Sequence, residues 1–222
     1  MDQISNLKAI SLLPLPDGIL FAYCAEKLDN MYRVAYKMVS FTSGKVSNVT
    51  KSIFMLTKFG PYYKTFAHKL KNYLTCFSIL LEDGQVFVVE RDGSATLFDA
   101  TGKELWEGKL LFENTAPGGI APNGGSLWAS FPEHNVLVRY NLKTLRQELR
   151  IGGNNSPFQK TEGIFPAGSK LFICNAGSNS IWKLDTSNYS TELFHQFDEP
   201  VYDYLFINNY EIARLESGIY LL

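Results

Sequence analysis

The feature that most constrains this chain is an internal repeat with a period of 44 residues. In the second half of the sequence, residues of the same type or character recur at that spacing without a gap. The aligned pairs are Gly119/Gly163, Ile120/Ile164, Pro122/Pro166, Gly124/Gly168, Leu127/Leu171, Trp128/Phe172, Asn135/Asn179, Arg139/Lys183 and Asn141/Asp185. A period of about 40 to 45 residues with short apolar runs between turns is typical of a repeat built from four β-strands. The repeat therefore predicts an all-β protein made of copies of one antiparallel sheet.

Tight-turn dipeptides mark five copies of this unit along the chain. Gly and Asn tolerate positive φ, and Asp and Asn side chains can bond to their own backbone, so such pairs connect neighbouring strands. The markers are Asp17-Gly18, Asp83-Gly84, Asn123-Gly124, Ala167-Gly168 and Asn208-Asn209. Five copies predict a five-bladed β-propeller that spans residues 1–222 as a single domain.

The last copy is one strand short. Its predicted strands are 202–207, 211–215 and 219–222, where the chain stops. The segment from Asp2 to Leu7 precedes the first inner strand, 10–15, and has the length of a strand. We expect it to complete the last blade and to close the propeller, because closure removes unpaired sheet edges.

Composition limits the partners and the location. The chain has 21 Lys and Arg against 22 Asp and Glu, so no long-range field draws nucleic acid or an anionic membrane to it. It lacks a membrane-length apolar run and a basic leader. We predict a soluble monomer that is cytoplasmic by default, or extracytoplasmic if a leader has been removed. Cys24, Cys76 and Cys174 are expected to be reduced core residues in strands.

One segment, residues 57–72, breaks the strand rhythm. We expect one or two helical turns in this insertion, which joins an outermost strand to the next inner strand. Its aromatic residues, Phe59, Tyr62, Tyr63 and Phe66, lie among lysines and could stack on a sugar or a base, or could instead cap the end of the ring. Tyr62, Lys64 and His68 are its candidate binding residues.

Polar residues on the inner strands are the second group of candidates. Glu162 and Asp203 are predicted near the axis of the propeller, with Tyr202 beside Asp203. Two carboxylates there could bind a divalent cation or act as an acid–base pair, and the alternative is a solvated channel. His134, in the 131–135 turn, is a further candidate, with an exposed turn residue as the alternative. The sequence contains no familiar nucleophile or zinc motif.

The stretch from Gly119 to Ser130 (GIAPNGGSLWAS) resembles blades of the NHL and streptogramin-lyase-like propellers. Residues 170–185 (KLFICNAGSNSIWKLD) look like the related repeats of bacterial surface-layer-like propellers. The resemblance implies the architecture, since the matched residues form turns and packing. Streptogramin lyases and the similar gluconolactonases are metal-assisted enzymes with six or seven blades, and none of their catalytic residues can be placed on this chain. Five-bladed sugar hydrolases need three axial acids, and two candidates are present.

Two functional hypotheses follow. The first is a non-catalytic propeller without a cofactor that binds a small molecule, a sugar or a protein segment on the face carrying the insertion. The alternative is a metal-assisted lyase or hydrolase with a divalent cation held by Glu162 and Asp203 at the axial mouth. A purely structural module of a larger assembly is a third reading.

Overall fold

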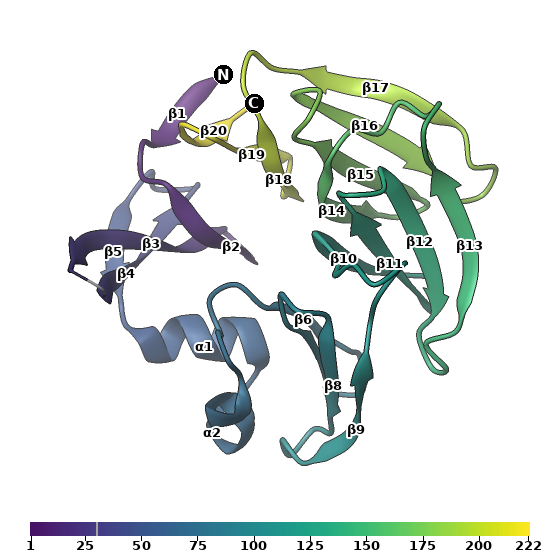
Figure 1. Cartoon of the computed structure of the whole chain (residues 1–222). Helices are drawn as coiled ribbons and strands as arrows, with labels where there is room; N and C mark the ends of the chain where they lie inside the picture. Colours follow the sequence, from purple (N-terminus) through teal and green to yellow (C-terminus); the bar gives the residue numbers. More distant parts are fainter. Residues whose placement is uncertain (30) are drawn as a thin grey trace. The chain divides into compact units, whose positions relative to one another are not determined.

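The computed structural model describes residues 1–29 and 31–222. In this part of the chain the strands form five four-stranded antiparallel sheets, the blades of a five-bladed β-propeller fold. Figure 1 shows the strands of each sheet. The all-β, five-bladed prediction is therefore confirmed. The chain divides into two compact units, and each is described by itself below. Unit 1 comprises Met1–Ile4, Leu110–Phe206 and Glu211–Leu222, and unit 2 comprises Ser5–Lys109 and Ile207–Tyr210. That residues 1–222 form a single domain stays a prediction.

Unit 1 contains the two sheets built from the best repeat copies. The strands of the first sheet are β10 (Gly119–Asn123), β11 (Ser126–Phe131), β12 (Val136–Asn141) and β13 (Gln147–Gly152). Those of the second are β14 (Thr161–Ala167), β15 (Lys170–Asn175), β16 (Ser180–Asp185) and β17 (Thr191–Gln196). In both sheets the strands pair in chain order. The repeat pairs Gly119/Gly163 and Leu127/Leu171 lie in corresponding strands of the two sheets.

The third sheet of unit 1 joins the two ends of the chain. Its strands are β18 (Val201–Ile207), β19 (Tyr210–Leu215), β20 (Gly218–Leu221) and β1 (Asp2–Ser5), in the spatial order β1-β20-β19-β18. The amide of Gln3 donates to the Tyr220 hydroxyl across 3.0 Å between the two terminal strands. The N-terminal strand therefore completes the last blade, as predicted.

Unit 2 contains the other two sheets. The strands of its first sheet are β2 (Ala9–Leu15), β3 (Gly18–Leu28), β4 (Met31–Ser40) and β5 (Val46–Val49). Those of its second sheet are β6 (Phe77–Leu80), β7 (Val86–Val89), β8 (Ser94–Phe98) and β9 (Glu104–Lys109). Between β5 and β6 lie α1 (Lys51–Phe59), α2 (Tyr63–Phe66) and the 3-10 turn η1 (Ala67–Lys69). The predicted connection from an outermost strand to the next inner strand is thus observed.

The helical segment begins earlier than the sequence analysis predicted. The helix starts at Lys51, because the Thr50 hydroxyl accepts a hydrogen bond from the backbone N–H of Ile53 and caps the first turn. Side chains at 54, 55, 58 and 59 then share one buried face, which is the spacing of an amphipathic helix. This helix, not only the predicted turns after residue 57, forms the main part of the insertion.

Interleaved aromatic and aliphatic side chains form the cores. In unit 2, Phe54, Phe59 and Phe66 from the helices join a cluster with Leu20 of β3 and Val88 of β7. In unit 1, Trp128 and Leu171 belong to one buried cluster, and Cys174 and Tyr204 belong to another. The expectation for the cysteines is right for Cys174 but wrong for Cys24, which is exposed, and Cys76 is buried just before β6 and not within it.

Candidate functional site

The three candidates on the insertion are exposed in unit 2. Tyr62 immediately precedes α2, Lys64 lies on α2 and His68 lies on η1, and all three side chains face solvent. The short α2 is held against the β8–β9 hairpin, where the Thr65 hydroxyl donates to the carbonyl of Thr101 over 3.4 Å. The insertion is thus anchored to the second sheet of unit 2 and presents these residues outward.

Two of the four insertion aromatics are core residues and cannot stack on a ligand. Phe59 and Phe66 are fully buried. The Phe66 ring stacks on that of Phe98 with 4.1 Å between centroids, and it meets the Phe59 ring edge-on at 5.9 Å. A sugar- or base-stacking role for these two rings is therefore wrong, and only Tyr62 keeps a widely exposed ring.

Lys58 of α1 is buried, which the sequence analysis missed. Its ammonium group donates to the carbonyl of Leu74 over 2.9 Å and lies 5.8 Å and 5.6 Å from the ring centroids of Phe54 and Phe59. A buried charge needs such partners, because removal from water is costly. The signal was present in the spacing, since Lys58 follows Phe54 by four residues on the same helix face.

The solvent side of α1 carries apolar side chains where polar ones are usual. Ile53 and Leu56 lie one turn apart with 44% and 49% of their surface exposed. At the end of the helix, a Cβ on Gly60 would lie 3.6 Å from the Leu80 side chain, which is 51% exposed. Tyr62 follows two residues later. We call Ile53, Leu56, Tyr62 and Leu80 the α1 patch, and exposed apolar side chains grouped on and just after one helix are typical of interaction surfaces.

In unit 1 the structure brings Glu162, Tyr202 and Asp203 into one polar cluster. Arg214 Nε of β19 donates to Asp203 Oδ2 over 2.5 Å, and its guanidinium lies 5.1 Å from the Tyr202 ring centroid. The Tyr202 hydroxyl donates to Glu216 Oε2 over 2.8 Å. The pKa of Tyr202 is raised by this bond, then by burial and by the charges of Glu216 and Glu162.

Glycines of the preceding repeats leave room for the two carboxylates. A Cβ on Gly118 would lie 3.1 Å from Glu162 Oε2, and one on Gly163 would lie 2.8 Å from Asp203 Oδ1. At Gly163 a side chain would also collide with the carbonyl of Tyr202 at 2.5 Å. The close backbone approach of β14 and β18 therefore sets the positions of the acidic groups.

The cluster contains an ion pair between Arg214 and Asp203. Arg214 and Asp203 have side chains 20% and 32% exposed, so the pair is partly shielded from water. The metal hypothesis needs the Asp203 carboxylate as a ligand. Arg214 already places a positive charge beside that carboxylate, which opposes the binding of a metal cation there. Among the described residues, no group of three or more His, Cys, Asp and Glu side chains is arranged to hold a metal ion.

The buried thiol of Cys174 lies behind this cluster. Burial raises the pKa of Cys174 well above its usual value, and the negative charge of Asp203 raises it further. A thiol in this state is a poor nucleophile, since the thiolate is the reactive form. Cys174 is thus a core residue and no candidate for covalent chemistry.

His134 contacts the segment that precedes β10 in unit 1. Its Nδ1 lies 3.4 Å from Glu113 Oε2, and its ring meets that of Phe112 edge-on at 5.3 Å. The side chain is 27% exposed, so it is less open than a free turn residue. The structure does not bring His134 together with Glu162, Tyr202 and Asp203 through any contact among the described residues.

The sequence did not reveal all the residues that form the polar cluster of unit 1 and the α1 patch of unit 2. Arg214 and Glu216 were not singled out, because a strand pattern does not reveal which side chain on β19 faces one on β18. Ile53 and Leu56 were missed because the helix was expected to begin later.

None of the helices in the described part of the chain has the length and apolarity that crossing a bilayer requires.

Comparison with known proteins supports the fold and goes no further. No protein-family model matches the chain. No curated protein matches it either. Among solved structures, the chain is similar to U3-55K (TM-score 0.57, 11% identity, 98% of this chain and 61% of that one). It is also similar to the WD40 repeats of RRP9 (TM-score 0.54, 12% identity, 94% and 58%).

A third similar structure is Sqt1 from Saccharomyces cerevisiae (TM-score 0.53, 8% identity, 92% of this chain and 68% of that one). The chain spans only 61% and 58% of the U3-55K and RRP9 chains, so it matches part of those propellers. At such low identity the likeness establishes the β-propeller fold alone.

Proposed function

We propose that this protein is a non-catalytic β-propeller that binds a protein segment through the α1 patch. The observation that carries the proposal is the apolar solvent side of α1, with Ile53 and Leu56 about half exposed on a helix that is otherwise anchored in the core. Exposed aliphatic and tyrosine side chains on a rigid support are suited to protein contacts. The similar solved structures include WD40 repeats, a fold-level likeness that accords with a binding scaffold.

The chemistry around the patch favours a partner with apolar and acidic side chains. Lys51 and Lys64 are exposed at the two ends of the helical segment. The insertion contains no Asp or Glu between residues 51 and 72. An acidic partner therefore meets the positive charges of Lys51 and Lys64 at the rim and apolar contacts at the centre. A sugar or a small molecule is less favoured, because Phe59 and Phe66 are unavailable for stacking.

A pair of matched double variants tests the proposal. A photo-cross-linking amino acid placed at position 53 is used to capture the bound protein in cells, and the captured protein is then purified and titrated. Ile53→Asp with Leu56→Asp is expected to weaken its binding at least tenfold, which corresponds to about 1.4 kcal/mol. Leu105→Asp with Leu193→Asp, at outer-strand residues of similar exposure, is the control and should bind unchanged. Equal binding by both double variants would refute a role for the patch.

The alternative, a metal-assisted reaction at Glu162 and Asp203, has its own direct test. Both carboxylates act on the pKa of Cys174, which supports their proximity, while Arg214 competes with a cation for Asp203. Titration with Mg²⁺, Ca²⁺, Mn²⁺ and Zn²⁺ is followed by thermal unfolding of the protein. A rise in Tm that is lost in Glu162→Gln but kept in Glu148→Gln would favour this alternative. No rise with any ion would remove it.

The resemblance of the β10–β13 and β14–β17 sheets to blades of NHL and streptogramin-lyase-like propellers belongs with these proposals. It rests on the sequence from Gly119 to Ser130 and from Lys170 to Asp185. The turn and packing roles of those residues support a common blade design and carry no activity.

A further inference from the structure

The outer edge of β4 is only half covered by the last strand of its sheet. β5 pairs with β4 from Tyr36 to Val39, whereas β3 pairs with β4 along its other side as far as Met31. β5 is the final strand in the order of this sheet. Within residues 1–29 and 31–222, no other strand pairs with β4 alongside Tyr32, Arg33, Val34 and Ala35. This first half of β4 is therefore an open strand edge in unit 2.

Backbone hydrogen bonds at the far end of β4 determine which amides face the open edge. The N–H of Ser40 donates to Lys45 on the β5 side, and the N–H of Phe41 donates to Asp17 on the β3 side, both over 3.1 Å. Because the bonding side alternates from residue to residue in an antiparallel strand, even-numbered residues of β4 face the β5 side. The one register shift adds a residue to β3 and leaves this alternation on β4 intact. The N–H and C=O groups of Val34 hence point to the open edge.

The chain itself does not fill the place beside Val34. If the register that pairs Tyr36 with Val49 continued by two residues, Lys51 would lie opposite Val34. Lys51 is the first residue of α1, which Thr50 caps, so the chain leaves the sheet at this point. The line of β5 therefore ends where α1 begins, and α1 contacts β4 on its apolar side through the Phe54 ring, 5.1 Å from that of Tyr36.

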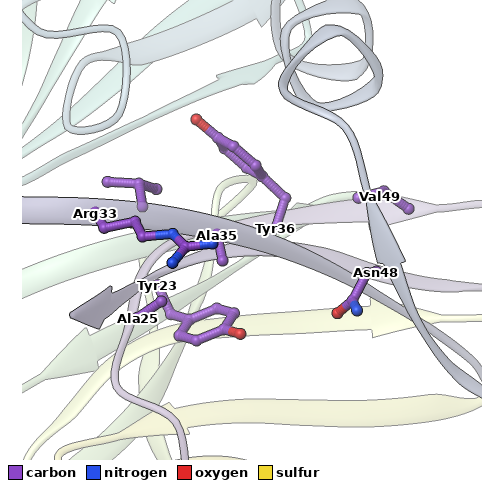
Figure 2. Close-up of a pocket in the computed structure, with 8 residues that line it drawn as sticks. Tyr23, Ala25, Arg33, Ala35, Tyr36, Asn48 and Val49 are labelled. Carbon is purple, nitrogen blue, oxygen red and sulfur yellow. The ribbon is translucent and has the colours of Figure 1, made fainter.

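A pocket of about 480 Å³ lies at this corner, and it is lined by Tyr23, Ala25, Arg33, Val34, Ala35, Tyr36, Asn48 and Val49 (Figure 2). Figure 2 shows Tyr23 and Tyr36 pointing to opposite sides of the sheet. Val34, Tyr36 and Val49 lie on the side that packs against the core of unit 2. Side chains alternate along a strand, so Arg33 and Ala35 lie on the other side with Tyr23. An added strand would thus meet an apolar side and a polar side.

The sequence that forms the edge is rich in positive charge. Between residues 30 and 81 the sequence has eight Lys and Arg residues and no Asp or Glu, although the whole chain has a net charge of −1. Arg33 is paired with Glu26 at 3.7 Å, and both side chains are widely exposed, so this pair is weak and replaceable. Lys37 lies over the Tyr23 ring at 5.6 Å from its centroid. The polar side of the edge is therefore complementary to carboxylates.

We propose that the open edge of β4 binds an extended acidic protein segment that adds to the sheet as a new strand. An apolar side chain of the segment lies opposite Val34, and acidic side chains lie opposite Arg33 and Ala35, where main-chain bonds give affinity and the side chains give selectivity. This surface is distinct from the α1 patch, and the proposal holds whether or not that patch binds a protein.

The probe is a blocked, fluorescein-labelled heptapeptide of alternating glutamate and valine with valine at its centre. Binding to the full chain is measured by fluorescence anisotropy at low and at physiological salt. The first control is the same peptide N-methylated at the central valine, which keeps every charge and side chain but cannot donate a hydrogen bond to the Val34 carbonyl. We expect saturable binding that N-methylation weakens at least about tenfold, the loss of one to two backbone hydrogen bonds. A peptide with lysine in place of glutamate is expected not to bind.

Two variants of the edge complete the test. Val34→Pro removes the outward N–H while leaving the bonds to β3 in place, since proline is tolerated at a strand edge. It is expected to weaken peptide binding about tenfold relative to Val34→Thr, which keeps the amide and the branched side chain. Arg33→Glu is expected to weaken binding by a similar factor that shrinks at high salt. Circular dichroism confirms that each variant is folded.

Three results would overturn the proposal. Equal binding of the N-methylated peptide would show charge attraction without strand pairing. Equal binding by folded Val34→Pro and Val34→Thr would place the peptide elsewhere. A homodimer of the free protein that Val34→Pro dissociates in sedimentation experiments would make a second copy of this chain the occupant of the edge.

Discussion

The third and fourth strands of two blades show what the repeat does and does not dictate. In unit 1, β13 pairs with β12 from Val136 to Tyr140 and covers almost its whole length. In unit 2, β5 pairs only with the second half of β4. Both sheets have the same strand order, yet one edge is completed and the other is left open where α1 begins. The repeat specifies the sheet, and the interruption of the repeat creates new surface.

The two regions differ in charge as well. The acid-free segment from residue 30 to residue 81 lies within unit 2, and the rest of the chain carries the acidic excess. In unit 1 the polar cluster pairs Arg214 with Asp203. In unit 2 much of the positive charge faces solvent. We therefore expect binding to depend on unit 2 and the cluster of unit 1 to serve packing.

The largest expected effect concerns the close strand approach in unit 1. A Cβ at position 119 would lie 2.5 Å from the backbone carbonyl of Glu162. Gly119→Val should therefore lower the free energy of unfolding by about 5 kcal/mol or leave no folded protein, since backbone atoms cannot move aside cheaply. Denaturant unfolding monitored by tryptophan fluorescence measures this. Gly124→Asn, in open space with φ of 56°, is the control and should cost less than about 1 kcal/mol.

The next effect separates core from surface within the insertion of unit 2. Phe66→Ala removes a fully buried ring that stacks on Phe98, so it should lower the free energy of unfolding by about 3 to 5 kcal/mol. Tyr62→Ala, at a ring 52% exposed, should change it by less than about 0.5 kcal/mol. Urea unfolding of both variants provides the comparison. Similar losses in the two variants would contradict the division of roles drawn here.

Amide hydrogen exchange tests the contrast between covered and open edges directly. The amides of Tyr36 and Met38 face β5 and should be protected, whereas that of Val34 faces no strand among the described residues. We expect Val34 to exchange at least about 100-fold faster than Met38, because an unpaired amide needs no local opening. Leu137 of β12, which faces β13, should behave like Met38. Slow exchange at Val34 would mean that its edge is already occupied.

The smallest effect compares the same hairpin position in the two units at acid pH. The pKa of Asp99 is lowered chiefly by the Thr101 hydroxyl, and that of Asp185 chiefly by the Lys170 ammonium group. Because each folded-state pKa lies below the unfolded one, their stabilisation is present above pH of about 4 and is lost as the pH falls below it. Asp99→Asn and Asp185→Asn should each make the free energy of unfolding fall less steeply as the pH is lowered, as measured by urea unfolding.

Salt distinguishes the two aspartates. The stabilisation by Asp185 should shrink at high salt, because it depends on an ion pair whose lysine side chain is 38% exposed. That of Asp99 should persist, because it depends on hydrogen bonds from Thr101 of 2.7 Å and 2.8 Å. Equal salt sensitivity would argue that Lys170 is not the main partner of Asp185.

Most of the strand architecture could be read from local sequence. Turn residues such as Asn208 and Asn209, with φ of 48° and 70°, mark several of the places where the backbone is left-handed. The missing outer strand of the last blade pointed to β1 in the same way. The candidate sites were less accessible, since Tyr62, Lys64 and His68 follow from composition whereas Ile53 and Leu56 depend on where the helix begins.

The sequence by itself determined the repeat, the strand order and the partner of the N-terminal strand, because alternation, turns and spacing act over a few residues at a time. Only the tertiary structure decided that Phe59, Phe66 and Lys58 are buried, that Arg214 pairs with Asp203, and that the first half of β4 has no described strand on its β5 side. Those outcomes depend on which distant segments pack together and how much of each surface they cover. Long-range packing of that kind leaves no periodic trace in the chain.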